Sequence, residues 1–200
     1  MYTVHGHPRS RALRVIWALE ELEQPYEIDP LPPRSEKLRE VNGTGKIPVL
    51  GTPEGMISDS VAIITYLADA HGGLTYPAGT FARAHQDAVT HYVNAEIDSA
   101  LWLYAKHSFV LPEDWRVPAV KPTAVQEFSR AMEVLERLKG HRQFMAGDQF
   151  TIADILLSHC AGWGLSIKFP LPEGLFGEFL RSLRQRPAMQ RTLAQVKAFS

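Results

Sequence analysis

The sequence predicts an α/β domain followed by an all-helical domain, and three observations support this order. Residues 1–72 combine short apolar runs, as found in strands, with segments of helical periodicity. Residues 73–80 are dense in glycine, proline and threonine, which is typical of a linker. Residues 81–200 keep helical periodicity and contain no strand pattern. We therefore expect two domains, 1–72 and 81–200, joined by a linker at 73–80.

The composition is that of an ordinary globular protein. Of 200 residues, 45% are hydrophobic and 22% are charged, and the net charge is −1. This balance gives no electrostatic reason to expect nucleic acid or an anionic membrane as a partner. No apolar run approaches the ~20 residues of a membrane-spanning helix, and the N-terminus lacks a signal-peptide pattern, so we expect a cytoplasmic protein. The single cysteine, Cys160, excludes an internal disulfide, and the pattern around it predicts a buried thiol within a helix.

The first elements are predicted to be a strand, a helix and a parallel second strand. Residues 2–5 form the first strand, and Ser10 lies after the turn, where a helix N-cap belongs. The apolar stripe of the helix consists of Ala12, Val15, Ile16, Leu19 and Leu22. The charged residues that lie away from this stripe are Arg14, Glu20, Glu21 and Glu23. Gln24-Pro25 ends the helix, and a second strand at Tyr26 to Ile28 runs parallel to the first through the crossover.

A short helix then precedes a strand that begins at a proline. Residues 35–41 are predicted to be helical and are followed by the helix stop Asn42-Gly43. In residues 46–50, Lys-Ile-Pro-Val-Leu, Pro48 marks the beginning of a strand, because proline gives no ladder N–H and fixes φ. After a turn rich in glycine and proline, Met56-Ile57 is predicted to pair back as an antiparallel strand.

A helix begins directly after this hairpin, with Asp59 or Ser60 as its N-cap. Its apolar face consists of Val61, Ile64, Leu67 and Ala68. The proline-containing strand therefore lies beside a helix N-terminus, where unpaired N–H groups and the macrodipole favour a bound carboxylate. We expect this place to hold a peptide-like anion in extended form.

The second half of the chain is predicted to be helical throughout. A long periodic segment runs from residue 81 to about residue 109, prolines interrupt residues 112–122, and a further helix spans residues 123–139. Residues 151–154, Thr-Ile-Ala-Asp, form a capping box of the Ser/Thr-x-x-acid type. The residues at the N′ and N4 positions of the matching hydrophobic staple are Phe150 and Ile155.

Two motifs in this order resemble the glutathione S-transferase family. Residues 46–63, with strand-Pro-Val-Leu, a turn and then acidic-Ser-x-Ala-Ile, are similar to its thioredoxin-like, glutathione-binding domain. Residues 147–154, Gly-Asp-Gln-Phe-Thr-Ile-Ala-Asp, are similar to the buried-helix signature of its helical C-terminal domain. Residues 9–25, which contain the run Ser-Arg-x-x-Arg-Val-x-Trp-x-Leu-Glu-Glu-Leu, are similar to the first helix of bacterial members, among them those that use Ser or Cys. The resemblance covers nearly the whole chain and implies a βαβ-α-ββα domain followed by a helical bundle.

The resemblance also implies which residues bind glutathione. Pro48 would follow a cis peptide bond, and Ile47 would offer backbone hydrogen bonds to the cysteinyl part of the ligand. The acidic-Ser pair would hold the γ-glutamyl part, and the hydroxyl near the first helix would contact the sulfur. The implied glutathione-binding set is Ser10, Lys46, Ile47, Pro48, Asp59 and Ser60. Residues 42–46, Asn-Gly-Thr-Gly-Lys, depart from the usual Asn-Pro-x-Gly-Lys, and the extra glycine predicts a looser loop near the site.

The activity that the resemblance implies is attack of the glutathione thiol on an electrophilic small molecule. A free thiol has a pKa of about 8.5, so a hydroxyl donor and the positive end of a helix would favour the thiolate. The catalytic candidate is Ser10, for which a plain N-cap role is equally open. The alternative holders of the thiolate are backbone N–H groups at the helix start, Arg9 or Arg11.

Further residues are assigned by the resemblance to the helical domain. Leu101 would supply an apolar wall for the electrophile and Tyr104 a hydroxyl, although packing of aromatic side chains is the alternative. Asp98 would reach the amino group of a ligand across a homodimer. Glutathione is the implied cosubstrate and no metal is expected, since His5 and His7 have no further ligand at metal spacing.

Two other functions stay open beside the transferase. One is a glutathione-dependent peroxidase or reductive enzyme on the same fold. The other is a non-catalytic binding protein that keeps the glutathione fold. The intact Pro48 and Asp59-Ser60 pair indicates retained glutathione binding, which argues against the non-catalytic protein.

Overall fold

The computed structural model describes residues 1–199, which form two compact units. One unit combines Met1–Thr75 with the C-terminal segment from Leu183 onward, and the other is Tyr76–Ser182. The boundary after Thr75 falls within the predicted linker, whereas helical periodicity alone had grouped the C-terminal segment with the helical domain. Among the helices of this described part, none combines the length and apolar character that crossing a membrane requires.

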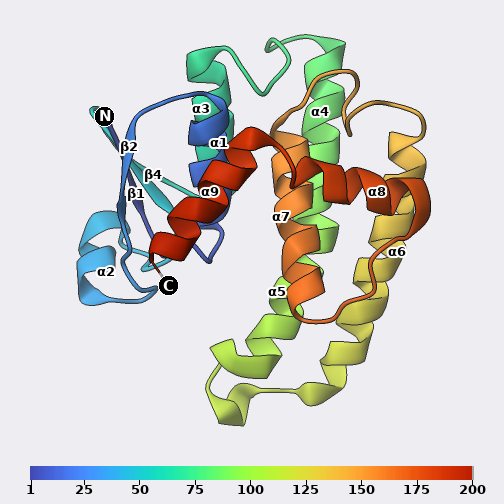
Figure 1. Cartoon of the computed structure of the whole chain (residues 1–200). Coiled ribbons are helices and arrows are strands. Elements are labelled where there is room, and N and C mark those ends of the chain that lie inside the picture. Colours follow the sequence, from blue (N-terminus) through green and yellow to red (C-terminus); the bar gives the residue numbers. More distant parts are fainter. Residues whose placement is uncertain (200) are drawn as a thin grey trace. The chain divides into compact units, whose positions relative to one another are not determined.

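The first unit is built on a four-stranded sheet of order β2-β1-β3-β4 (Figure 1). Its strands are β1 (Tyr2–His5), β2 (Tyr26–Asp29), β3 (Val49–Thr52) and β4 (Gly55–Ser58). Strands β1 and β2 are parallel, as a helical crossover requires, while β3 is antiparallel to both of its neighbours. The predicted βαβ-α-ββα order and thioredoxin-like class are confirmed.

Helices cover both faces of this sheet. They are α1 (Ala12–Glu21), α2 (Glu36–Asn42), α3 (Ser60–His71) and α9 (Pro187–Ala198). Val49 packs in a small core with Leu38 of α2, so by alternation Leu50 points to the opposite face, toward α1 and α3. Figure 1 shows α2 on one side of the sheet and α1 with α3 on the other. Helix α9 packs against α1 and completes this unit.

Two expectations for α1 are wrong. The N-cap position is Arg11 and not Ser10, because the turn before the helix already runs in a helical sense and the first regular residue is Ala12. Arg14, expected on the solvent side of the helix, is completely buried. Its guanidinium donates a hydrogen bond to Ser60 of α3, in the same unit, and this bond helps the charge to be buried.

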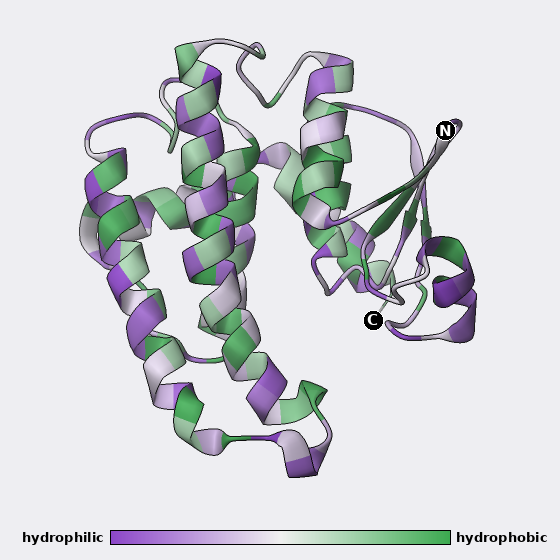
Figure 2. Ribbon diagram, turned by 180° about the vertical axis from the view of Figure 1, so that it is seen from behind, coloured by the Kyte–Doolittle hydropathy of each residue, from purple (hydrophilic) through white to green (hydrophobic). Residues whose placement is uncertain are grey.

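The second unit is helical, as predicted. The expected long segment is continuous and comprises α4 (Phe81–Tyr92), η1 (Val93–Asp98), α5 (Ser99–Ala105) and η2 (Lys106–Val110), where both η segments are π-helical. The other elements are η3 (Glu113–Trp115), η4 (Pro118–Val120), α6 (Lys121–Lys139), α7 (Ile152–Ser166) and α8 (Gly174–Leu183). Figure 2 shows hydrophobic and hydrophilic residues sharing the long helices, as expected for amphipathic helices that bury one side.

Helix α7 is the buried helix of this unit, and its predicted capping box is confirmed. The Asp154 carboxylate accepts the backbone N–H groups of Thr151 and Met145, each at 2.9 Å. Gly164 lets Phe128 pack directly on α7, since an added Cβ would lie 2.9 Å from the ring. These contacts fix α7 at both ends.

Candidate functional site

Three segments singled out by the sequence meet at one end of the sheet of the first unit. The register pairs His5 with Val49, and Val49 with Ser58. The turn after β1, the Ile47-Pro48 dipeptide before β3 and the Asp59-Ser60 dipeptide after β4 therefore lie at this same end. The sheet thus brings together residues that are more than fifty positions apart in the chain, such as Gly6 and Ser60.

The Ile47–Pro48 peptide bond is cis, as the resemblance implied. The half-buried Ile47 packs against the turn after β1, where a Cβ on Gly6 would lie 3.0 Å from the Cβ of Ile47. Gly6 also has a φ of 136°, which other residues rarely adopt. Only glycine therefore fits this close approach between the β1–α1 turn and the segment before β3.

Asp59 is the N-cap of α3, which confirms one of the two predicted caps. Its Oδ1 accepts the N–H groups of Val61 at 2.9 Å and Ala62 at 3.1 Å. Its Oδ2 accepts no hydrogen bond from residues 1–199, and the side chain is exposed. The backbone has φ 77° and ψ 124°, an uncommon conformation for a residue other than glycine and one that is found more often at functional sites. The carboxylate therefore has one oxygen on the helix and one available to a cation.

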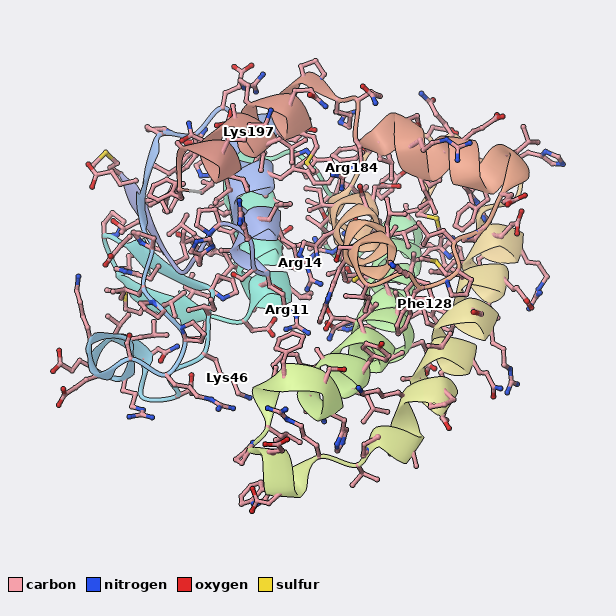
Figure 3. All side chains as sticks on the ribbon, turned by 60° about the horizontal axis from the view of Figure 1, so that its bottom comes forward. Arg11, Arg14, Lys46, Phe128, Arg184 and Lys197 are labelled. Atoms are coloured by element: carbon pink, nitrogen blue, oxygen red, sulfur yellow. The ribbon has the colours of Figure 1, made fainter. Side chains whose placement is uncertain are left out.

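Ser60, the next residue, is buried and bonded to Arg14. The Nη1 of Arg14 donates to Ser60 Oγ at 3.0 Å, and the two side chains are 0% and 3% exposed. Figure 3 places Arg11 and Arg14 at the same end of α1. Sequence reasoning missed Arg14 as a site residue because it lies off the apolar stripe and bonds a residue 46 positions away. The positive charge of Arg14 is thus buried next to Ser60, the first residue of α3.

Ser10 lies in the β1–α1 turn, and its hydroxyl donates one hydrogen bond and accepts another. Its Oγ donates to the carbonyl oxygen of His7 at 2.7 Å and accepts the N–H of Ala12 at 3.1 Å. The hydroxyl therefore satisfies the helix backbone although Ser10 is not the N-cap residue. The side chain is only partly buried, so a ligand can approach it.

The loop before β3 is better ordered than its glycines predicted. The Asn42 side chain accepts the N–H groups of Thr44 and Gly45, at 3.1 Å and 2.9 Å, and donates to the carbonyl of Lys46 at 2.8 Å. Gly43 adopts a φ of 68° as the C-terminal cap of α2. The expectation of a loose loop is wrong, because the Asn42 side chain forms hydrogen bonds with the backbone of three residues of this loop. Lys46 itself extends from this loop and is exposed (Figure 3).

The site residues expected in the helical unit are placed as follows. Leu101 is 0% exposed and is part of the core, while Tyr104 is half-buried and packs edge-on against Phe169, with 5.0 Å between ring centroids. Asp98 is 5% exposed and accepts a hydrogen bond from Cys160 Sγ at 3.8 Å. The role of Asp98 toward a ligand across a homodimer stays a prediction, and the hydrogen bond from Cys160 places its carboxylate beside α7. Cys160 is buried and free, as predicted.

Open hollows of the first unit lie at the other end of its sheet. One of about 340 Å³ is lined by residues around Pro25 and Tyr26, and Tyr26 pairs with Tyr2 at the start of β1. Burial and the hydrogen bond to Glu20 raise the pKa of Tyr26, which keeps the phenol neutral. None of the predicted site residues lines this hollow.

Across residues 1–199, no three His, Cys, Asp or Glu side chains are grouped as metal ligands.

Comparison with known proteins gives matches along both units. The N-terminal domain of glutathione S-transferase matches residues 4–75, and the C-terminal domain of glutathione S-transferase matches residues 83–180. A glutathione S-transferase of Pseudomonas putida is 26% identical over 209 residues, which cover 99% of this chain and 94% of the relative. Elongation factor 1-gamma of Trypanosoma cruzi is 28% identical over 153 residues, covering 75% of this chain and 36% of the factor. The chain thus spans about a third of that protein.

Solved structures show the same fold. A glutathione transferase from Methylococcus capsulatus has a TM-score of 0.87 at 24% identity, with 99% of this chain and 100% of that chain covered. A glutathione transferase from Phanerochaete chrysosporium, in complex with oxidized glutathione, has a TM-score of 0.86 at 22% identity, with 100% and 97% covered. The two domain matches lie in the order of the two units and span most of the sequence. The chain therefore belongs to the glutathione S-transferase family.

Proposed function

We propose that this protein binds glutathione at the gathered end of its sheet and activates the thiol for attack on an electrophilic small molecule. The observation that carries the proposal is the register of β1, β3 and β4, which brings the β1–α1 turn, Ile47-Pro48 and Asp59-Ser60 together. Family membership and the related structure that holds oxidized glutathione support glutathione as the ligand.

Each part of the tripeptide has a chemical match. Asp59 and Ser60 hold the γ-glutamyl end, where the open carboxylate oxygen suits an ammonium group. The backbone of Ile47 bonds the extended cysteinyl part beside Pro48. The exposed ammonium of Lys46 suits the carboxylate at the other end of the tripeptide.

Ser10 is the proposed donor to the glutathione sulfur. The thiol proton passes to solvent, and the thiolate is stabilised by the Ser10 hydroxyl and by the positive end of α1. For this the hydroxyl turns from the His7 carbonyl to the sulfur and keeps the Ala12 N–H as its donor. The thiolate electron pair then forms a C–S bond with an electrophilic carbon, and the electrons of the bond that breaks leave with the leaving group or move into the acceptor. In this proposal the Tyr104 hydroxyl contacts the electrophile.

The pH dependence of conjugation tests the role of Ser10. Ser10→Ala should raise the pH midpoint of the reaction rate and lower the rate near neutrality, because each unit of pKa corresponds to ~1.4 kcal/mol of preference for the thiolate. Cys160→Ala, in the buried core of the other unit, is the matched control and should leave both unchanged. An unaltered pH profile of the conjugation rate in Ser10→Ala would show that backbone N–H groups, Arg9 or Arg11 stabilise the thiolate in place of Ser10.

A non-catalytic binding role is the second candidate. The match to elongation factor 1-gamma, of which this chain covers only 36%, supports it, and so do the hydrogen bonds of the Ser10 hydroxyl to the backbone. A panel of electrophiles and peroxides separates the three functions in one assay series. Turnover of electrophiles supports the transferase, turnover of peroxides supports the peroxidase, and glutathione binding without turnover supports the binding protein.

A further inference from the structure

We propose that His5 and Met56 form a binding site for a soft monovalent metal ion of the Cu(I) class, on the face of the sheet that α2 partly covers. The two ligands are Nε2 of His5 and Sδ of Met56, and Asp29 holds the imidazole in place. None of these three residues belongs to the proposed glutathione-binding set. The site is therefore a second one on the same unit and does not rest on the proposed function.

The hydrogen bond at one nitrogen of His5 determines what the other nitrogen can do. His5 Nδ1 lies 3.2 Å from Asp29 Oδ2, and because an ionised carboxylate only accepts, Nδ1 carries the proton of the neutral imidazole. Nε2 then presents a lone pair, and among residues 1–199 it has no hydrogen-bond partner. A carboxylate bonded to the far nitrogen is the arrangement that orients metal-binding histidines.

The sheet register brings the sulfur of Met56 to the same place. Thr3 pairs with Gly51 and Gly51 with Met56, so Met56 lies on the same face of the sheet as His5, two residues after Thr3. A Cβ added to Gly51 would lie 3.4 Å from His5 Nε2 and 3.6 Å from Met56 Sδ. The nitrogen and the sulfur therefore border one small space above Gly51, where the strand carries no side chain. Glycine inside a strand often marks such a close approach of a ligand.

The two ligands differ in mobility, which suits metal binding. The His5 side chain is 12% exposed and is held by Asp29, whereas Met56 is 53% exposed on the edge strand β4. A methionine side chain is unbranched and flexible, so its sulfur can move toward Nε2 while the backbone stays in place. A fixed imidazole and an adjustable thioether are sufficient for an ion that accepts two ligands.

The ligands also determine the kind of ion. Both are neutral, and thioether sulfur selects Cu(I), for which imidazole is a suitable second ligand. Lys37 Nζ lies 3.2 Å from Asp29 Oδ2, so this carboxylate adds little net charge that would favour a doubly charged ion. Zn(II) sites use three or four protein ligands, a number that these residues do not supply. Sequence spacing offered His5 no further ligand, because only the fold of the sheet brings Met56 near it.

Titration of the whole protein with Ag(I), a redox-stable ion with the ligand preferences of Cu(I), tests the site. The buffer contains no chloride and no glutathione, since both bind Ag(I). With isotope-labelled methionine methyl groups, NMR should show the Met56 resonance shifting to saturation at one equivalent of Ag(I). Met1, which is 71% exposed, is the internal control for a thioether outside the site, and its resonance should not saturate there. The Met56 resonance is assigned by its absence in Met56→Leu.

Substitutions at the site then measure each contribution. His5→Gln and Met56→Leu should each lower the affinity for Ag(I) by at least about tenfold and leave the affinity for glutathione unchanged. Gly51→Ala should also weaken Ag(I) binding, because its methyl group fills the shared space at contact distances that the fold tolerates. The exposed His91, in the helical unit, gives the matched control His91→Gln, and Cys160→Ala tests the buried thiol. Neither control should change the affinity for Ag(I).

The role of Asp29 is tested by a pair of variants. Asp29→Ala should lower the affinity for Ag(I) by about tenfold, and Asp29→Asn, which keeps an acceptor for Nδ1, should restore part of it. A Met56 resonance that shifts no more than that of Met1 would overturn the proposal, and so would an unchanged affinity in Met56→Leu, an exposed substitution that decides the matter even where His5→Gln does not fold. Tighter binding of Zn(II) than of Ag(I) would overturn the assignment to a soft monovalent ion.

Discussion

Asp59 illustrates how one residue serves the fold and the proposed site at once. Its Oδ1 caps α3, and its backbone holds a φ of 77° that most residues avoid. Asparagine tolerates this φ better than most residues and is as good an N-cap as aspartate, but it has no charge. The cap and the charge are therefore separable by substitution.

Asp59→Asn should weaken glutathione binding by ~1.5–3 kcal/mol and leave the free energy of unfolding nearly unchanged, because only a charge-assisted contact is lost. Asp59→Ala should also lower the free energy of unfolding, by ~0.5–2 kcal/mol for the cap. Calorimetry of binding and chemical denaturation measure the two effects separately. Wild-type affinity in a folded Asp59→Asn variant would remove the carboxylate from the site.

At the residue scale the sequence predicts positions better than roles. Pro48 and Asp59 were found because a strand start and a helix start restrict the residue type. The burial of Arg14 was missed, since its partner Ser60 is distant in the sequence and a charge on a helix is normally solvated. The order in the loop at 42–46 was missed because the bonds of a single side chain, Asn42, decide it.

At the element scale, the start of α7 combines a capping box with a buried carboxylate. Burial raises the pKa of Asp154 from 3.8 to about 6, against the hydrogen bonds from Met145 and Thr151, which lower it. The folded protein therefore binds this proton more tightly than the unfolded chain. Between these two pKa values the folded state holds more protons, so the contribution of Asp154 to stability falls as the pH rises.

Comparison with Asp154→Asn isolates this contribution. The free energy of unfolding of the wild-type protein, relative to that of the variant, should fall as the pH rises from about 4 to about 6 and level off above. The difference of about 2 between the pKa values sets an upper size of ~3 kcal/mol. Denaturant unfolding across this pH range measures the difference, and a relative stability that rises with pH would show that the hydrogen bonds outweigh burial.

The C-terminal helix shows what periodicity cannot predict. The guanidinium of Arg186 binds the Glu21 carboxylate through Nε at 2.6 Å and Nη2 at 2.8 Å, and Arg191 Nε binds Glu20 at 2.6 Å. These pairs join α9 to α1, across 165 residues of sequence in the case of Glu21. A helical pattern predicts that α9 is a helix with one apolar side, but not which unit that side packs against. Prolines, glycines and caps, by contrast, predicted the order and the ends of most elements.

At the scale of the whole molecule, we expect a homodimer. Each unit exposes large apolar residues of the kind that subunit interfaces cover: Met56 on the edge strand β4 is 53% exposed, and Phe81 at the start of α4 is 90% exposed. Light scattering at micromolar concentration should give about twice the chain mass of 22.4 kDa. A mass that stays at the single-chain value over this range would contradict the expectation.

The central claim is that the gathered end of the sheet in the first unit binds glutathione through its γ-glutamyl end. Calorimetric titration of the wild-type protein with glutathione, beside the dipeptide Cys-Gly that lacks this end, tests it most directly. We predict saturable binding of glutathione with one molecule per chain, and binding of Cys-Gly that is weaker by at least about tenfold, because the contacts to Asp59 and Ser60 are absent. Failure to bind glutathione, or equal affinity for the two peptides, would contradict the account.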